Sequence, residues 1–220
     1  MKDRIGYLAW IVGAVQFFVI HGIVESAWAS PYSWARNNIS DLGNVHCAMQ
    51  AEPEPRYVCS PAHEMMNASF VVLGILLVVG AVLGDIWRRG IIGTVSRLLI
   101  ASAGAGFVLV GLAPADVDEN QHFIGALLVM GMGNLGLLVA GFALARRIRG
   151  PLRRLTTPLG VTAIAAFALF LFHHYLGLGM GGMERVAAFP LLVWTLLIAT
   201  HGLSNLTRHG APHTGRHVSG

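Results

Sequence analysis

Charged residues are scarce in this sequence. Only 12% of the 220 residues are Asp, Glu, Lys or Arg, whereas soluble domains carry about a quarter. Hydrophobic residues make up 55% of the chain, and the mean hydropathy is +0.62. This composition excludes an ordinary water-soluble fold. The net charge of +4 comes without any nucleic-acid recognition motif, so we expect no nucleic-acid partner.

Strict metal-binding motifs are also missing. The run His63-Glu64-Met65-Met66-Asn67 begins like the zinc motif H-E-x-x-H but ends in Asn67, which lacks the second imidazole. The C-terminal segment 207–220 carries histidines spaced four residues apart, which would share a face of a helix. Glycine and proline lie between them, however, and favour a disordered cytoplasmic tail.

Long apolar runs dominate what is present. Five of them approach the roughly 20 residues that cross a bilayer as a helix. A sixth, Leu98–Ala113, becomes long enough if it begins near Thr94 and Arg97 snorkels toward the headgroups. The five runs are Ile5–Val24, Ala68–Leu83, Phe123–Ala145, Leu159–Tyr175 and Val186–Leu206. We therefore expect an all-α, multi-pass bundle of six helices over residues 1–206 in the cell membrane, surrounded by membrane lipids.

The distribution of charge predicts the orientation, because Lys and Arg are enriched in cytoplasmic loops. With the N-terminus inside, twelve of the fifteen basic residues are cytoplasmic, and only Arg36, Arg56 and Arg185 face out. Nine of the eleven acids lie on the outer side. Both termini are therefore expected in the cytoplasm.

The N-terminal segment imitates a secretory signal, with Lys2 and Arg4 before an apolar stretch and Ala27-Trp28-Ala29 after it. The apolar stretch of about 20 residues exceeds the 7–15 residues typical of a signal. We expect the first helix to be retained.

The longest connection, residues 26–62, contains both cysteines. Two cysteines in an exported loop indicate one disulfide, and the alternative is a pair of free thiols. Because the orientation places this loop in an oxidising space, we expect a Cys47–Cys59 disulfide.

Glycine and proline predict three local features. Pro158 suits the first turn of the fifth helix, and the glycines of segment 177–184 predict a flexible outer loop. The small residues of Gly131–Gly136, around Asn134, favour close helix packing, with a broken helix of the transporter kind as the alternative.

Ionisable and polar residues gather at the predicted outer ends of the helices. Such groups are costly in a membrane and are functional candidates. Because the helix ends of a bundle lie close together, we expect one polar basin near the outer headgroup plane. The candidates for catalysis are Asp41, His63, Asp116, His122 and His173, and those for substrate binding are Asn38, Ser40, Asn67, Glu184 and Arg185.

Two chemistries would use such a basin. Histidine and carboxylate ligands are able to hold a divalent metal with an open position, which activates water or polarises a phosphoryl or acyl group. Alternatively, a His–Asp pair acts as base and orienter for a substrate hydroxyl, with Ser40 as a nucleophile.

The motifs also carry a resemblance. The run Asn38-Ile39-Ser40-Asp41-Leu42-Gly43 resembles the signature of the family catalogued as domain of unknown function 998. Three further pieces follow in the order expected for that family: His63 to Asn67, Gly111-Leu112-Ala113-Pro114-Ala115-Asp116 with His122, and Gly182-Met183-Glu184-Arg185 with Pro190. The resemblance implies a compact prokaryotic multi-helix membrane protein. The family has no settled activity.

Our leading hypothesis is a membrane enzyme, a hydrolase or transferase, that acts on a small amphiphile or lipid at the outer face. Arg185 would hold an anionic headgroup. The rival class is a transporter, a lipid-translocating protein or an assembly factor. A polar path that continues inward from His21 through Gln16, Asn134 and His201 would favour transport, whereas polarity confined to the outer third favours chemistry.

Overall fold

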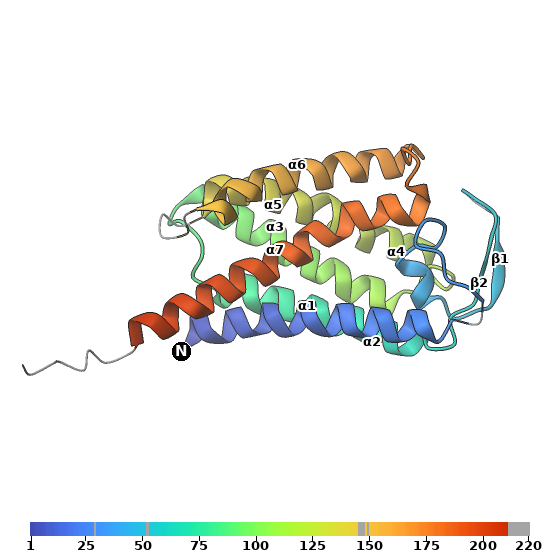
Figure 1. Cartoon of the computed structure of the whole chain (residues 1–220), viewed down its shortest axis with the longest axis horizontal. Coiled ribbons are helices and arrows are strands. Elements are labelled where there is room, and N and C mark those ends of the chain that lie inside the picture. Colours follow the sequence, from blue (N-terminus) through green and yellow to red (C-terminus); the bar gives the residue numbers. More distant parts are fainter. Residues whose placement is uncertain (29, 52, 145–147, 149, 211–220) are drawn as a thin grey trace, which may run out of the picture.

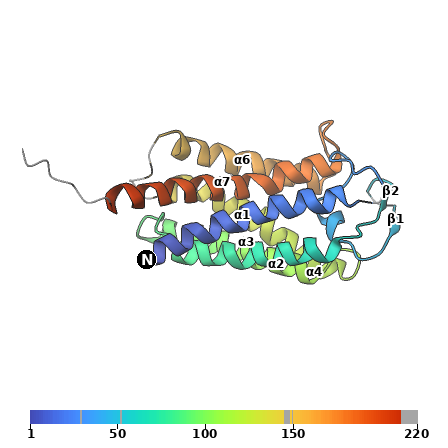
Figure 2. The same cartoon turned by 60° about the horizontal axis from the view of Figure 1, so that its bottom comes forward.

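The computed structural model describes residues 1–28, 30–51, 53–144, 148 and 150–210, with the backbone alone for 208–210. Long helices run side by side in one elongated bundle (Figures 1 and 2). Six helical segments are long and apolar enough to cross a membrane, which confirms the predicted all-α arrangement. They are α1 (Lys2–Ser26), α2 (His63–Leu83), α3 (Ile91–Leu112), the continuous segment Glu119–Ala143, α6 (Pro151–Leu171) and α7 (Gly179–Gly210).

The fourth span consists of three helical pieces. These are α4 (Glu119–Ala126), the π-helical segment η2 (Leu127–Gly133) and α5 (Asn134–Ala143). A Cβ atom on Gly133 would lie 2.7 Å from Ala103 Cβ, so α3 packs directly against this backbone. The predicted close packing is therefore present, and the helix widens locally instead of breaking.

The predicted fifth span starts too late in the chain. Helix α6 begins at Pro151 and not near Leu159, so Pro158 lies inside the helix and Pro151 occupies its first turn. The hydropathy signal missed this first part because Arg153 and Arg154 make it polar. A helix end at the headgroups tolerates such residues, since their side chains reach water.

The last span also begins earlier than predicted. Helix α7 starts at Gly179, which places Gly181 and Gly182 in its first turns and not in a flexible loop. A Cβ atom on Gly181 would collide with the backbone of Asn37, so this glycine permits close contact with the first loop. At its other end, α7 continues past Leu206 to Gly210, and residues 211–220 of the expected tail lie outside the described residues.

The connection between α1 and α2 has its own structure. It contains the short helix η1 (Ser40–Gly43) and an antiparallel pair of strands, β1 (Ala48–Gln50) and β2 (Arg56–Val58). The strands were not predicted, because three residues are too few to show a periodic pattern. A disulfide joins Cys47 to Cys59 beside these strands, as predicted.

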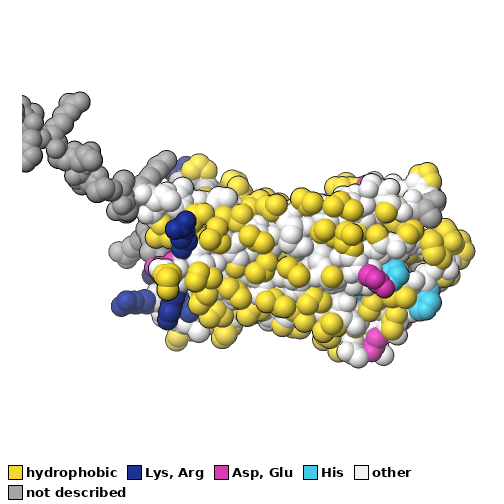
Figure 3. Space-filling model, turned by 90° about the horizontal axis from the view of Figure 1, so that it is seen from below, with side chains coloured by type: hydrophobic (Ala, Val, Ile, Leu, Met, Phe, Trp, Pro, Cys, Tyr) yellow, Lys and Arg dark blue, Asp and Glu magenta, His cyan; other side chains and the backbone are white. Residues whose placement is uncertain are grey.

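The bundle therefore has two different ends. We call the end with residues 27–62, 113–118 and 172–178 the loop end, and the end with Met1 the basic end (Figure 1). Figure 3 shows Lys and Arg gathered at the basic end and acids and histidines near the loop end. Some of the charged residues behind the predicted orientation lie outside the described residues. They are Arg146, Arg147, Arg149, Arg216 and Glu52.

Candidate functional site

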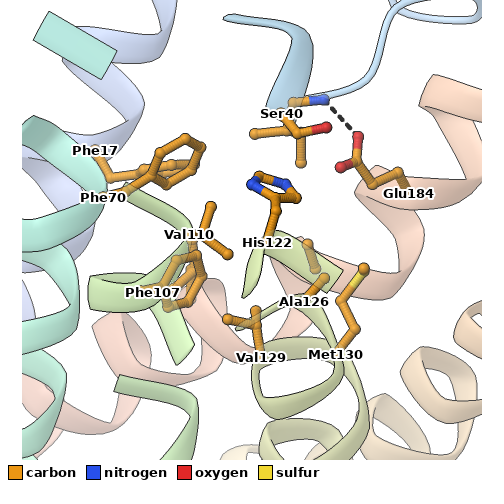
Figure 4. Close-up of a pocket in the computed structure, with 13 residues that line it drawn as sticks. Phe17, Ser40, Phe70, Phe107, Val110, His122, Ala126, Val129, Met130 and Glu184 are labelled. Carbon is orange, nitrogen blue, oxygen red and sulfur yellow. Dashed lines mark hydrogen bonds between the residues drawn. The ribbon is translucent and has the colours of Figure 1, made fainter. Parts of the chain in front are cut away.

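A small cavity of about 40 Å³ lies at the loop end, inside the bundle (Figure 4). Its polar side chains are Ser40 from η1, His122 from α4 and Glu184 from α7. The rest of the lining is predominantly apolar. The apolar side chains are Phe17, Ile39, Phe70, Phe107, Val110, Ala126, Val129, Met130, Ala188 and Leu192.

His122 is held in a defined orientation. Asp118 caps the start of α4 by accepting a hydrogen bond from the Gln121 amide at 3.0 Å, which sets His122 on the first turn. Its Nδ1 lies 2.8 Å from the carbonyl oxygen of Ala113 and donates to it. The neutral ring therefore carries its proton on Nδ1 and keeps a lone pair on Nε2. The ring lies below Ser40 in the cavity (Figure 4).

Glu184 connects the last helix to the first loop. Its carboxylate oxygen Oε2 accepts a hydrogen bond from the backbone amide of Ile39, which immediately precedes η1. Only 7% of Glu184 is exposed. The contact fixes the start of η1, and with it the position of Ser40 at the edge of the cavity (Figure 4).

Three phenylalanines form the aromatic floor of the cavity. Phe17, Phe70 and Phe107 come from α1, α2 and α3, with ring centroids 5.8 to 6.4 Å apart.

Two polar residues deeper in the bundle form hydrogen bonds to neighbouring helices. Gln16 donates to the carbonyl oxygen of Ser69 at 3.1 Å. Asn134 likewise donates from its Nδ2 atom to an α7 carbonyl at 2.7 Å.

Asp41 lies beside the cavity and is paired with Arg56. The guanidinium donates through Nε and Nη2 to the two carboxylate oxygens, each at 2.8 Å. The amide of Asn38 donates to the same carboxylate at 2.9 Å. Burial disfavours the charged guanidinium, but the hydrogen bonds and attraction of Asp41 outweigh it and raise the pKa of Arg56. This pair holds the first loop in shape.

Arg185 also holds the first loop in place. Its Nη1 donates to the carbonyl oxygens of Trp34, Asn37 and Gly181 at 3.2, 2.8 and 2.8 Å. Its Nη2 donates to the Tyr32 hydroxyl at 2.5 Å, and the guanidinium lies 4.8 Å from the centre of the Trp34 ring. Burial raises the pKa of Tyr32. Arg185 therefore fastens residues 32–37 to α7 and does not line the cavity.

Asp116 fastens a second part of the loop end. It accepts hydrogen bonds from the amides of Val45 and His46 at 3.0 and 2.6 Å, and His46 Nδ1 lies 3.0 Å away. Burial favours the neutral acid, but these hydrogen bonds outweigh it and lower the pKa of Asp116. The link between α3 and α4 is thereby joined to the first loop.

Three predicted residues bond elsewhere at the loop end. His173 is exposed and follows α6, with its Nδ1 3.0 Å from the Tyr175 hydroxyl. The other two lie in the first turns of α2 and contact backbone carbonyls of the preceding loop. These contacts are His63 Nδ1 to Ser60 O and Asn67 Nδ2 to Gly43 O, each at 2.9 Å.

The polar residues of the loop end thus fall into two groups, those that line the cavity and those that hold the surrounding loops in place. We call the second group frame residues, and they are Asp41, His46, Arg56, Asp116 and Arg185. Of the ten predicted residues, Ser40, His122 and Glu184 line the cavity. Sequence reasoning missed Arg56 and His46 as frame residues. The signal for Arg56 was present, since it is one of only two Lys or Arg residues in the first loop. Within the described part of the chain, no group of three or more His, Cys, Asp or Glu side chains is placed to hold a metal ion.

Six apolar spans with buried polar groups at one end define a multi-pass membrane protein. The chain belongs to the family described as "Protein of unknown function (DUF998)", whose model matches residues 11–201. That match confirms the resemblance carried by the motifs, and it includes every residue of the cavity. No curated protein and no solved structure matches the chain.

Proposed function

We propose that this protein is a membrane enzyme that acts on an amphiphile at the outer face, with His122 as its acid–base group. The observation that carries the proposal is the cavity itself. It combines an oriented imidazole, a hydroxyl and a carboxylate above an apolar floor. Ligand sites commonly have this composition, with a few placed polar groups in an apolar lining.

The composition of the cavity suggests how a substrate lies. Its reacting group meets Ser40 and His122, and the atoms next to that group lie against the aromatic side chains. The volume of about 40 Å³ has room for about three water-sized groups. Only the reacting group and its nearest atoms fit, so the rest of the substrate lies outside the cavity.

His122 supplies the chemistry. Its Nε2 lone pair accepts a proton from water or a hydroxyl as that oxygen attacks an ester or phosphoester centre of the substrate. The imidazolium then returns this proton to the leaving oxygen. With water as the attacking group the reaction is a hydrolysis, and with a second hydroxyl it is a group transfer. Ser40 is a candidate to bind the substrate or act as the hydroxyl nucleophile.

The frame residues have a positioning role in this proposal. Asp41, Asp116 and Arg185 each form hydrogen bonds with the first loop. We therefore reassign Arg185 from headgroup binding to holding the loop. Glu184 both lines the cavity and fixes the start of η1, so it positions Ser40. No metal enters the scheme.

The loop end faces outward in this proposal. The support is the charge asymmetry, because most Lys and Arg residues belong to the opposite end and such residues are enriched on the cytoplasmic side of membrane proteins. The rival function is a carrier or assembly factor that binds the amphiphile without converting it. Hydrogen bonds tie Gln16 to α2 and the Nδ2 atom of Asn134 to α7, and this use in helix packing favours chemistry at the loop end over a polar path through the bundle.

The test is a lipid analysis of a deletion strain complemented with variants. We expect a precursor to accumulate in the deletion strain, wild type to remove it, and His122→Ala to leave it in place. The matched control is His63→Ala, which removes a histidine of the same end that bonds a loop carbonyl outside the cavity. An unchanged lipid profile in the deletion strain, or full complementation by His122→Ala, would refute the enzyme proposal.

A further inference from the structure

A second and larger cavity lies at the basic end, far from the candidate active site. Its volume is about 430 Å³, within the roughly 300–1,000 Å³ typical of ligand sites. Asp3 and Tyr7 of α1 and His201, Gly202 and Asn205 of α7 line it. The proposed function uses none of these residues.

The position of this cavity matches a lipid headgroup region. His201 follows the start of α7 at Gly179 by 22 residues. At a rise of 1.5 Å per residue this is about 33 Å along the helix, close to the ~30 Å hydrocarbon thickness of a bilayer. A cavity around His201 therefore opens at the headgroup level of the membrane face that the basic end occupies.

A close helix crossing shapes the cavity. A Cβ atom on Gly202 would lie 2.5 Å from Cζ of Tyr7, so α7 packs directly on the face of that ring. Tyr7 itself is buried, with 3% of its surface exposed. The two helices are held in this arrangement by packing, and the cavity beside them is preformed.

The lining includes a negatively charged hydrogen-bond acceptor and an oriented hydrogen-bond donor. Asp3 is the only acid among the described residues of the lining. Asn205 Nδ2 lies 3.1 Å from His201 Nε2 and donates to it. The neutral imidazole of His201 therefore carries its proton on Nδ1, where it donates to an oxygen of a ligand.

The surroundings have the opposite charge. Lys2 and Arg4 flank Asp3 in the sequence, and basic residues begin α6 and precede α3 at the same end. A ligand that fits this arrangement carries a cation for Asp3 and an anion that the basic residues of this end attract. A primary ammonium, with three N–H donors, suits a carboxylate and other acceptors. A quaternary ammonium is typically held in an aromatic cage, whereas the described part of the lining contains a single aromatic residue, Tyr7.

We propose that this cavity binds a zwitterionic aminophosphate, the headgroup chemistry of an ethanolamine phospholipid. The ammonium pairs with Asp3, His201 donates to a phosphate oxygen, and the Lys and Arg residues of the basic end attract the phosphate. The ligand is a lipid of the membrane face at the basic end or the corresponding soluble zwitterion. It is separate from the substrate of the loop-end site.

Native mass spectrometry of the purified full chain in detergent micelles tests the site. Three phospholipids with identical acyl chains and phosphoethanolamine, phosphocholine or phosphoglycerol headgroups are titrated separately. We expect the ethanolamine lipid to bind about tenfold more tightly than the other two, which corresponds to about 1.4 kcal/mol. Equal affinity of wild type for the three lipids would overturn the proposal without recourse to any variant.

Variants test whether the preference for the ethanolamine lipid depends on Asp3. Asp3→Asn is expected to remove it, and Asp3→Glu to retain most of it. Glu64→Gln, which removes an acid at the start of α2 at the loop end, is the matched control and keeps the preference. A preference that persists in Asp3→Asn contradicts the assignment. Competition with glycerophosphoethanolamine distinguishes the sources: displacement supports the soluble zwitterion, and retention of the lipid supports the membrane headgroup.

Discussion

Asp41 and Arg56, 15 residues apart in the first loop, form a two-pronged salt bridge with both N–O distances at 2.8 Å. The Asp41 side chain is only 3% exposed and that of Arg56 10%. The bridge thus connects the start of η1 with strand β2. The fold thus brings together two separate parts of the first loop.

Breaking this pair is expected to destabilise the protein strongly. Arg56→Met leaves a buried carboxylate without its cation, which typically costs about 3–5 kcal/mol. Thermal unfolding in detergent measures the loss. The double variant Asp41→Asn with Arg56→Met removes both charges and is expected to recover part of it. A double variant as unstable as the sum of the single ones would show that the two side chains do not interact.

The contact between Asp116 and the first loop is expected to weaken in acid. Its folded pKa is lowered below the ordinary value of 3.8, so its stabilising contribution is fully present above that value and is lost as the pH falls through the folded pKa. Hydrogen exchange at Val45 and His46, measured between pH 7 and pH 3 and corrected for intrinsic rates, reports the change. Asp116→Asn should show raised exchange already at neutral pH, and equal protection in the variant and wild type would contradict the expectation.

Filling the cavity is expected to block the substrate. Ala126→Leu adds side-chain volume to a cavity of about 40 Å³ and displaces the group that binds there. Lipid analysis of the complemented strain should show the precursor retained, at a stability cost of at most about 1–3 kcal/mol. Ala101→Leu, on α3 and outside the lining, is the matched control. Equal complementation by both variants would show that the function does not depend on the cavity.

The α2–α3 contact depends on glycine. A Cβ atom on Gly104 would lie 2.6 Å from the carbonyl oxygen of Gly74, so Gly104→Ala forces the helices apart and should cost about 1–3 kcal/mol. Gly22→Ala is the control, because nothing lies within 4 Å of its added Cβ. That variant should be neutral or stabilising by up to about 1 kcal/mol through helix propensity. Thermal unfolding of both variants checks the contrast, and equal effects would contradict it.

The Cys47–Cys59 bond is expected to stabilise the loop end locally. It closes a loop with a sequence separation of 12, for which a stabilisation of about 3 kcal/mol is typical. Cys47→Ser with Cys59→Ser should raise hydrogen exchange in β1 and β2 while leaving α5 and α6 unchanged. The same protection in both proteins would show that the salt bridges alone hold this hairpin.

The spans could be predicted because membrane crossing leaves a long, continuous apolar signal, as in the run Ala68–Leu83 within α2. The helix ends could not, since polar residues such as Arg153 extend a helix into the headgroups without changing that signal. The same limitation applies to the site. His122 and Glu184 could be placed at one end of the bundle, but their neighbours depend on side-chain packing. Residues such as Phe17, within a predominantly apolar helix, carry no sequence mark that separates a cavity wall from a lipid-facing side chain.

The hydrogen bond between Glu184 and the Ile39 amide joins residues separated by 145 positions. During synthesis the first loop is made early, whereas its anchor belongs to the final span. Until α7 has inserted, the start of η1 lacks this partner and the residues that Arg185 fastens are unsupported. Chains that stop short of α7 therefore carry a complete first loop whose start at η1 is not yet anchored. Insertion of α7 is the step that assembles the loop end.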